Sequence, residues 1–106
     1  MKPRPSLPGA TLGRFGGGKL GRMFALAARR LGYRVHLFAP EDACPADGVV
    51  DKHIACAYAD ESRVADFARS VDVVTYEFEN VPADAVAVAQ RHAPVRPGPQ
   101  VLADTQ

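Results

Sequence analysis

Short apolar runs alternate along this chain with longer segments in which apolar residues recur every three or four positions. The runs are rich in β-branched and aromatic residues, which predicts buried strands, and they are residues 11–15, 33–38, 53–57 and 72–76. The periodic segments predict amphipathic helices at residues 19–31, 60–70 and 82–92. This alternation predicts an α/β fold, namely a Rossmann-like parallel sheet of four or five strands with helices on both faces.

Individual residues support several of these boundaries. Asp60 is a suitable N-cap for the second helix, and Pro82 suits the first turn of the third. Residues 92–97 form a short extended piece that can supply a fifth strand. Arg14 does not fit, because it lies inside a strand that should be central and apolar. Its guanidinium must reach solvent or a carboxylate, since burying it unpaired is very costly. The apolar stripe of the first helix comprises Leu20, Met23, Phe24, Ala27 and Leu31.

The length and charge of the chain restrict its class. With 106 residues it is large enough for one domain, which we expect at residues 11–106 after a disordered lead at residues 1–10. Thirteen Lys and Arg against twelve Asp and Glu give a formal net charge of +1, so nothing indicates a nucleic-acid or membrane partner. No apolar run approaches the ~20 residues of a membrane span, and a signal-peptide pattern is lacking, which indicates the cytoplasm. His53 and Cys56 resemble half of a metal site, but no second pair stands nearby, so we expect no metal.

The most informative motif is the glycine run between the first strand and the first helix. Gly16, Gly18 and Gly21 satisfy G-x-G-x-x-G, in which the first two allow a tight turn and the approach of a ligand, and the third allows close packing of helix and strand. A strand, a glycine loop and a helix in this order direct backbone N–H groups and the positive helix end at a phosphate. On its own the motif is equally consistent with a tight turn that binds nothing.

The second predicted strand argues against the usual ligand of such a loop, a dinucleotide. Dinucleotide sites need an acid at the end of the second strand, about 20 residues after the loop, to bind ribose hydroxyls. Here that strand is followed by Ala39, whose side chain cannot accept a hydrogen bond. Glu41 and Asp42 lie beyond Pro40 and could replace this acid only if the turn folded back.

A second polar motif follows the fourth predicted strand. Glu77 and Glu79 are two residues apart, so they point the same way if the strand persists, and Asn80 comes next. Ligands of open α/β sheets bind at the carboxyl ends of the strands, where the strand order reverses. If the first and fourth strands are neighbours, the glycine loop and this acidic turn face each other across one crevice. Each motif alone could be a solvated turn, but their meeting at one crevice favours a binding site.

Four segments together resemble a known family. Residues 16–23, 27–35, 73–82 and 95–97 look like the N-terminal domain of N5-carboxyaminoimidazole ribonucleotide synthetase, also called the ATPase subunit of phosphoribosylaminoimidazole carboxylase. The resemblance covers residues 11–106. Its most specific part is the run Tyr-Glu-Phe-Glu-Asn-Val that begins at Tyr76, placed after a strand and downstream of this glycine loop.

The resemblance implies a function and a set of binding residues. The family comprises ATP-grasp ligases of de novo purine synthesis, which use ATP and bicarbonate to carboxylate the amino group of 5-aminoimidazole ribonucleotide through carboxyphosphate, with magnesium on the ATP phosphates. By position, the glycine loop would lie against the ribonucleotide, and Glu77 foremost would hold its ribose or amino group. The implied substrate-binding residues are Gly16, Gly17, Gly18, Lys19, Leu20, Arg22, Glu77, Glu79 and Asn80. No catalytic residue is implied.

Three positions depart from the family pattern, which usually has Gln at Lys19, an apolar residue at Arg14 and an acid at Ala39. Lys19 keeps a donor and adds a charge that suits a phosphate, but it loses the amide acceptor. The family also continues beyond residue 106 into the ATP-grasp domain, which carries ATP, magnesium and the catalytic residues. We therefore expect a fragment without a cofactor or catalysis of its own. Its face toward the missing domain would be apolar and could support self-association.

Two other interpretations stay open. The chain could belong to an active enzyme whose remaining domains lie on another chain. It could also be a stand-alone nucleotide- or phosphate-binding module descended from the family.

Overall fold

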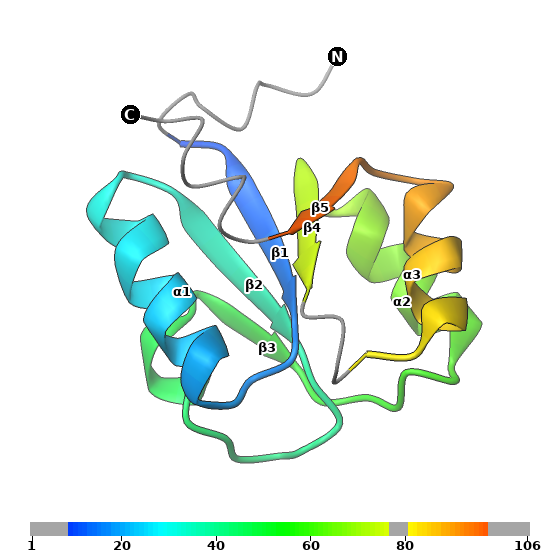
Figure 1. The fold of residues 1–106 in the computed structure, drawn as a ribbon, viewed down its shortest axis with the longest axis horizontal. Coiled ribbons are helices and arrows are strands. Elements are labelled where there is room, and N and C mark those ends of the chain that lie inside the picture. The colour runs from blue at the N-terminus through cyan, green and yellow to red at the C-terminus, as the bar shows by residue number, and fades with distance from the viewer. Residues whose placement is uncertain (1–8, 77–80, 98–106) are drawn as a thin grey trace.

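A parallel sheet of five strands lies between two layers of helix (Figure 1). The computed structural model describes residues 9–76 and 81–97. The elements are β1 (Thr11–Phe15), α1 (Lys19–Arg30), β2 (Arg34–Phe38), the 3₁₀ turn η1 (Asp47–Val49), β3 (Lys52–Ile54), α2 (Glu61–Arg69), β4 (Val73–Tyr76), α3 (Ala83–Gln90) and β5 (Val95–Pro97). The strand order β3-β2-β1-β4-β5 confirms the predicted Rossmann-like α/β architecture.

The central strand β1 explains why helices cover both faces. Its side chains alternate, so Leu12 packs with the α1 residue Phe24, whereas Phe15 packs with the α2 residue Phe67. On the second face, β1 lies so close to α2 that Gly13 could not be replaced by a residue with a side chain. A Cβ at this position would lie 2.8 Å from Cζ of Phe67. Figure 1 shows α1 on one face and α2 with α3 on the other. No helix in the described ranges is long and apolar enough to cross a membrane.

The larger core cluster lies under α2 and α3 and is organised by aromatic rings. Phe15 contacts Phe38 edge to face at 5.7 Å between ring centroids, and it contacts Phe67 at 5.3 Å. Tyr58 joins this group at 5.7 Å from Phe15. Such ring pairs add about 0.5–1.5 kcal/mol each beyond the area that they bury. This cluster therefore fixes the carboxyl ends of β1 and β2 against α2.

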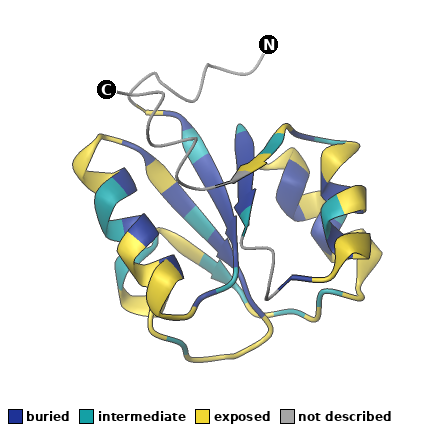
Figure 2. Cartoon of the chain, in the orientation of Figure 1, coloured by how far each residue is buried: buried dark blue, intermediate teal, exposed yellow. Residues whose placement is uncertain are grey.

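The sequence-based stripe of α1 is wrong for three of its members. Leu20, Met23 and Leu31 are 55%, 58% and 38% exposed, and Figure 2 shows the outer side of this helix as mostly exposed. The buried residues of α1 are Gly21, Phe24, Ala25 and Ala28. On this side the small residues Gly21, Ala25 and Ala28 flank Phe24, which packs into the core, whereas Leu20, Met23 and Leu31 remain on the outside.

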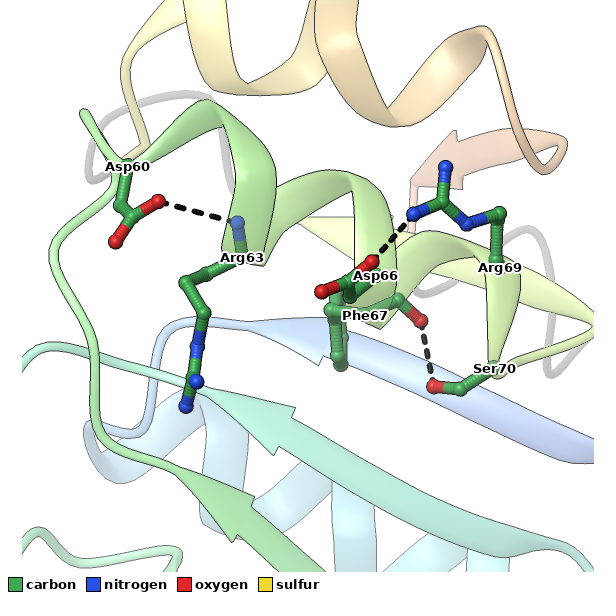
Figure 3. Close-up of polar contacts among 6 residues, drawn as sticks. All are labelled: Asp60, Arg63, Asp66, Phe67, Arg69 and Ser70. Carbon is green, nitrogen blue, oxygen red and sulfur yellow. Dashed lines mark hydrogen bonds and ion pairs between the residues drawn. The ribbon is translucent and has the colours of Figure 1, made fainter.

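Most predicted boundaries are confirmed. Asp60 caps α2 by accepting a hydrogen bond from the backbone N–H of Arg63 at 3.1 Å (Figure 3), and Pro82 is the N-cap of α3. The third strand is shorter and earlier than the predicted 53–57, because its ladder ends where β2 ends: the N–H of Ala39 donates to the carbonyl of Ile54.

Hydrogen bonds to backbone N–H groups order the amino edge of the sheet near Gly9, Thr11 and Val35. Residues 1–8 are outside the described ranges, whereas the N–H of Gly9 donates to the carbonyl of Gly32 at 3.0 Å. Asp72 accepts a hydrogen bond from the N–H of Thr11 at 2.7 Å. Asp51 does the same for the N–H of Val35 at 2.8 Å. Each carboxylate thus receives an N–H at or near the start of a strand.

Candidate functional site

The strand order meets the condition on which the predicted crevice depends. β1 pairs with β2 on one side and with β4 on the other, and Arg14 is in register with both Leu37 and Thr75. The chain runs from β1 outward in both directions, so the order reverses between β1 and β4. In sheets of this kind ligands bind at the carboxyl edge near the reversal. The glycine loop leaves the sheet at that edge, and β4 also ends there, at Tyr76.

The glycine loop has the geometry that its motif predicts. Gly16 has a φ of +94°, a left-handed backbone conformation that residues other than glycine rarely adopt. Its N–H donates to the carbonyl of Phe38 at 3.0 Å. Gly21 lies so close to the loop that a Cβ would stand 2.4 Å from the carbonyl oxygen of Gly16. Gly18 is the N-cap of α1, and nothing lies within 4 Å of where its Cβ would be. The first turn of α1 therefore opens onto free space.

A cavity of about 470 Å³ lies in front of this loop. It is lined by Arg14, Phe15, Gly16, Gly17, Gly18, Lys19, Leu20, Gly21, Glu41 and Tyr58. The first turn of α1 contains no acidic residue and the N-cap has no side-chain hydrogen bond, so the positive helix end is not neutralised locally. Lys19 adds a further positive charge, which makes this wall of the cavity suited to an anion.

The structure brings together five of the nine predicted site residues, Gly16 through Leu20. Arg22 does not line the cavity, because its guanidinium turns to the loop after β2 and donates to the carbonyl of Pro45 at 3.4 Å. Glu77, Glu79 and Asn80 lie outside the described residues. The acidic half of the predicted site therefore remains a prediction.

Arg14, which did not fit the first strand, does not reach bulk solvent. It is 3% exposed, and its guanidinium carbon lies 5.1 Å from the centroid of the Phe24 ring. A cation over an aromatic face gains about 2 kcal/mol when it is desolvated. Because Arg14 also lines the cavity, the residue that departs from an apolar strand is a residue of the candidate site.

Sequence reasoning missed two side chains of the cavity. The turn after β2 does fold back, so Glu41 lines the cavity although it lies beyond Pro40. Tyr58 comes from the loop between β3 and α2, and burial raises its pKa to about 12, with a smaller contribution from the Glu41 carboxylate. It is therefore a neutral hydroxyl at physiological pH. Both residues follow the carboxyl end of a strand, which is the signal that could have identified them.

The loop after β2 is joined to the glycine loop. The N–H of Ala46 donates to the carbonyl of Gly17 at 2.9 Å, and Cys44 packs so tightly that its sulfur lies 2.4 Å from a Cβ built on Gly17. Burial raises the pKa of the Cys44 thiol, which disfavours a reactive thiolate. These contacts fix the loop that carries Glu41 against the glycine loop.

The two residues considered as half of a metal site contribute to loop structure. Nδ1 of His53 lies 2.8 Å from a carboxylate oxygen of Asp47, and its Nε2 lies 3.3 Å from the carbonyl of Ala39. The sulfur of Cys56 donates to Asp60 at 3.6 Å. His53 thus ties the loop after β2 to the edge of the sheet.

A parallel sheet whose strand order reverses between β1 and β4, with a glycine loop at its carboxyl edge, defines a Rossmann-like domain. Residues 9–106 match the family described as the ribonucleotide synthetase pre-ATP-grasp domain, and the chain belongs to this family.

Three comparisons describe its relatives. N5-carboxyaminoimidazole ribonucleotide synthase of Brucella melitensis is 46% identical over 93% of this chain. A structure of N5-carboxyaminoimidazole ribonucleotide synthetase in complex with ADP is 41% identical over 92% of the chain, with a TM-score of 0.79 and 26% of its own chain covered. The N5-carboxyaminoimidazole synthetase of Staphylococcus aureus, also complexed with ADP, is 31% identical over 95% of the chain, with a TM-score of 0.80 and 27% of its own chain covered. The chain spans 27% of the length of the Brucella relative.

Proposed function

We propose that this chain is the N-terminal, substrate-binding domain of an ATP-dependent ligase of de novo purine biosynthesis, which carboxylates 5-aminoimidazole ribonucleotide with bicarbonate. The observation that carries the proposal is the cavity in front of the glycine loop, at the carboxyl edge of the sheet. Family membership and the names of the relatives support this reaction rather than another use of the same fold.

In this proposal the ribonucleotide lies along the carboxyl edge of the sheet. The N–H groups at the start of α1 and the Lys19 ammonium bind an anionic or polar part of it. Glu77 follows Tyr76, the last residue of β4, and accepts a hydrogen bond from a ribose hydroxyl or from the amine, with Glu79 and Asn80 beside it in the sequence. The domain binds and orients the substrate and does not act on the reacting atoms by itself.

ATP and magnesium belong, in this proposal, to the part of the ligase that the chain does not match. Two relatives were solved with ADP, and the chain covers about a quarter of each. We expect the 106-residue chain alone to show no ATP hydrolysis that depends on 5-aminoimidazole ribonucleotide. A coupled ADP-release assay tests this expectation, and ribonucleotide-dependent turnover would contradict it.

The site is tested by titrating the labelled chain with 5-aminoimidazole ribonucleotide and following amide shifts by NMR. Shifts should cluster at residues 16–22 and 76–80. Glu77→Gln removes a charge-assisted hydrogen bond and should weaken binding by about 1–2 kcal/mol without changing the fold. Glu61→Gln, an exposed residue in the first turn of α2, is the matched control. Unchanged affinity in the Glu77 variant, or shifts spread over other regions, would contradict this site.

One observation favours a second candidate function, a stand-alone nucleotide- or phosphate-binding module. The described lining of the cavity includes the glycine loop, the uncapped start of α1 and Lys19, which suit a phosphate without a further group. Such a module should bind AMP or inorganic phosphate as tightly as 5-aminoimidazole ribonucleotide. A preference for the ribonucleotide over AMP would favour the ligase domain.

A further inference from the structure

The cavity carries charges of both signs at defined places. Arg14 is buried and rests on the Phe24 ring, so its positive charge is fixed beside the glycine loop. Glu41 comes from the loop after β2 and is exposed, and it brings a carboxylate to the same cavity. β2 and β4 lie on opposite sides of β1, so this acid belongs to the side of the crevice away from β4.

The Tyr58 hydroxyl lies in the same cavity as the Arg14 and Glu41 charges and is influenced by both. Burial is the main cause that raises the pKa of this hydroxyl; the Glu41 carboxylate raises it further, whereas the Arg14 guanidinium lowers it. The same hydroxyl lies 3.9 Å from a Cβ built on Gly16, so it stands directly against the glycine loop. A ligand seated on the loop therefore meets a fixed cation, a neutral hydroxyl and a carboxylate within one cavity.

We propose that Arg14 and Glu41 are specificity-determining residues that bind the ribose 5-phosphate portion of the substrate, Arg14 contacting the phosphate and Glu41 the ribose hydroxyls. This inference rests on the proposed function and assigns two contacts that the sequence pattern did not. A guanidinium and free helix N–H groups are suited to a phosphate, and a carboxylate is suited to a pair of vicinal hydroxyls. Glu41 thus performs the task of the acid that Ala39 cannot perform.

The charges also decide which way the sugar phosphate lies. A phosphate near Glu41 would be repelled by a like charge, whereas the Arg14 side adds Lys19 and the positive end of α1. Hydroxyls carry no charge and can donate to the carboxylate. The sugar therefore points toward the loop after β2, and its phosphate points toward the start of α1.

The experiment compares ribose 5-phosphate with 2-deoxyribose 5-phosphate, each titrated into the full chain by NMR. The unaltered protein should bind the ribose compound about tenfold more tightly, because the deoxy sugar leaves a charged acceptor without one donor. Glu41→Gln should reduce this preference to below about threefold. Asp42→Asn, which alters the neighbouring acid, should leave the preference unchanged.

The role of Arg14 is tested by the overall affinity for both sugar phosphates, rather than by the preference for ribose over deoxyribose. Arg14→Leu should weaken both sugar phosphates about tenfold while keeping the ratio between them, since it removes one charge-assisted contact to the phosphate. Arg14→Lys keeps the charge and should recover part of the loss, which separates a charge effect from a packing effect. Arg30→Leu, at the exposed end of α1, is the matched control and should bind as the unaltered chain does.

The outcomes separate this inference from the proposed function. An unchanged ribose preference in Glu41→Gln overturns the inference, as does the absence of any ribose preference or of saturable binding in the unaltered chain. An unchanged affinity in Arg14→Leu overturns the assignment of the phosphate. If the sugar phosphates behave as expected but 5-aminoimidazole ribonucleotide binds no better than ribose 5-phosphate, the inference stands and the proposed function fails.

Discussion

Gly21→Ala tests how closely α1 approaches the glycine loop. In a helix interior Ala is favoured over Gly by about 1 kcal/mol, so propensity alone predicts a more stable protein. The structure predicts the opposite. The new Cβ would stand 2.4 Å from the carbonyl oxygen of Gly16 and 3.3 Å from its carbon, and both are backbone atoms that no rotamer change can move.

The magnitude follows from these two terms. Overpacking a well-packed site costs about 1–3 kcal/mol, and the upper part of that range applies here because the backbone must shift. After subtraction of the propensity gain, we expect a net loss of about 1–2 kcal/mol in the free energy of unfolding. Urea denaturation followed by circular dichroism measures it, with an unchanged m-value confirming that only stability has changed.

Gly48→Ala is the matched control for this substitution. Gly48 lies in the η1 turn, and nothing lies within 4 Å of where its Cβ would be. Its replacement should change the unfolding free energy by less than about 0.5 kcal/mol. A Gly21→Ala protein at least as stable as the unaltered chain would show that helix and loop are not in close contact, and the predicted shape of the crevice would fail with it.

Three further predictions concern capping and pH. Asp60→Ala should destabilise the protein by about 1 kcal/mol, because the N–H of Arg63 loses its acceptor; thermal unfolding measures the loss, and an unchanged midpoint would contradict it. Asp72→Asn should cost about 1–2 kcal/mol in urea denaturation, because the N–H of Thr11 exchanges a charged acceptor for a neutral one, and hydrogen exchange of that amide should become faster. Burial, reinforced by Lys52, lowers the pKa of His36 below its ordinary value of 6.5. The unfolded chain therefore takes up the proton first, so the protein should lose stability as the pH falls below about 6.5. His36→Gln should lose less stability than the unaltered chain between pH 7.5 and pH 5, and equal losses would refute this cause.

The elements of the fold could be predicted because local patterns determine them. The capping acid Asp60, the glycine loop and the apolar strand runs each act within a few residues, and each is confirmed, except that the third strand is shorter and earlier than predicted. Which side of α1 is buried against the sheet could not be predicted from such local patterns. Apolar spacing marked Leu20 and Met23, but the buried side carries Phe24 among the small residues Gly21, Ala25 and Ala28, and only packing against the sheet determines this.

The candidate site could be predicted only where one motif contains it. The glycine loop is continuous in sequence, so its five residues were identified together. Glu41 and Tyr58 come from two other loops, and their position depends on the strand order and on a turn that folds back at Pro40. Arg14 appeared to be an error in an apolar strand, because its partner ring, Phe24, lies on a different element. Contacts between elements decide these three positions.

The two edges of the sheet have different roles, as the carboxylates of Asp51 and Asp72 show. Both acids satisfy backbone groups at the edge where strands begin, whereas the cavity lies at the edge where strands finish. Substitutions of these two acids should therefore change stability, whereas substitutions of exposed side chains that line the cavity, such as Glu41, should change ligand preference. Protein engineering could therefore raise the stability of the domain by substitutions where strands begin, and could alter the cavity independently. The same separation lets a lineage alter what the crevice binds without first rebuilding the domain that holds it.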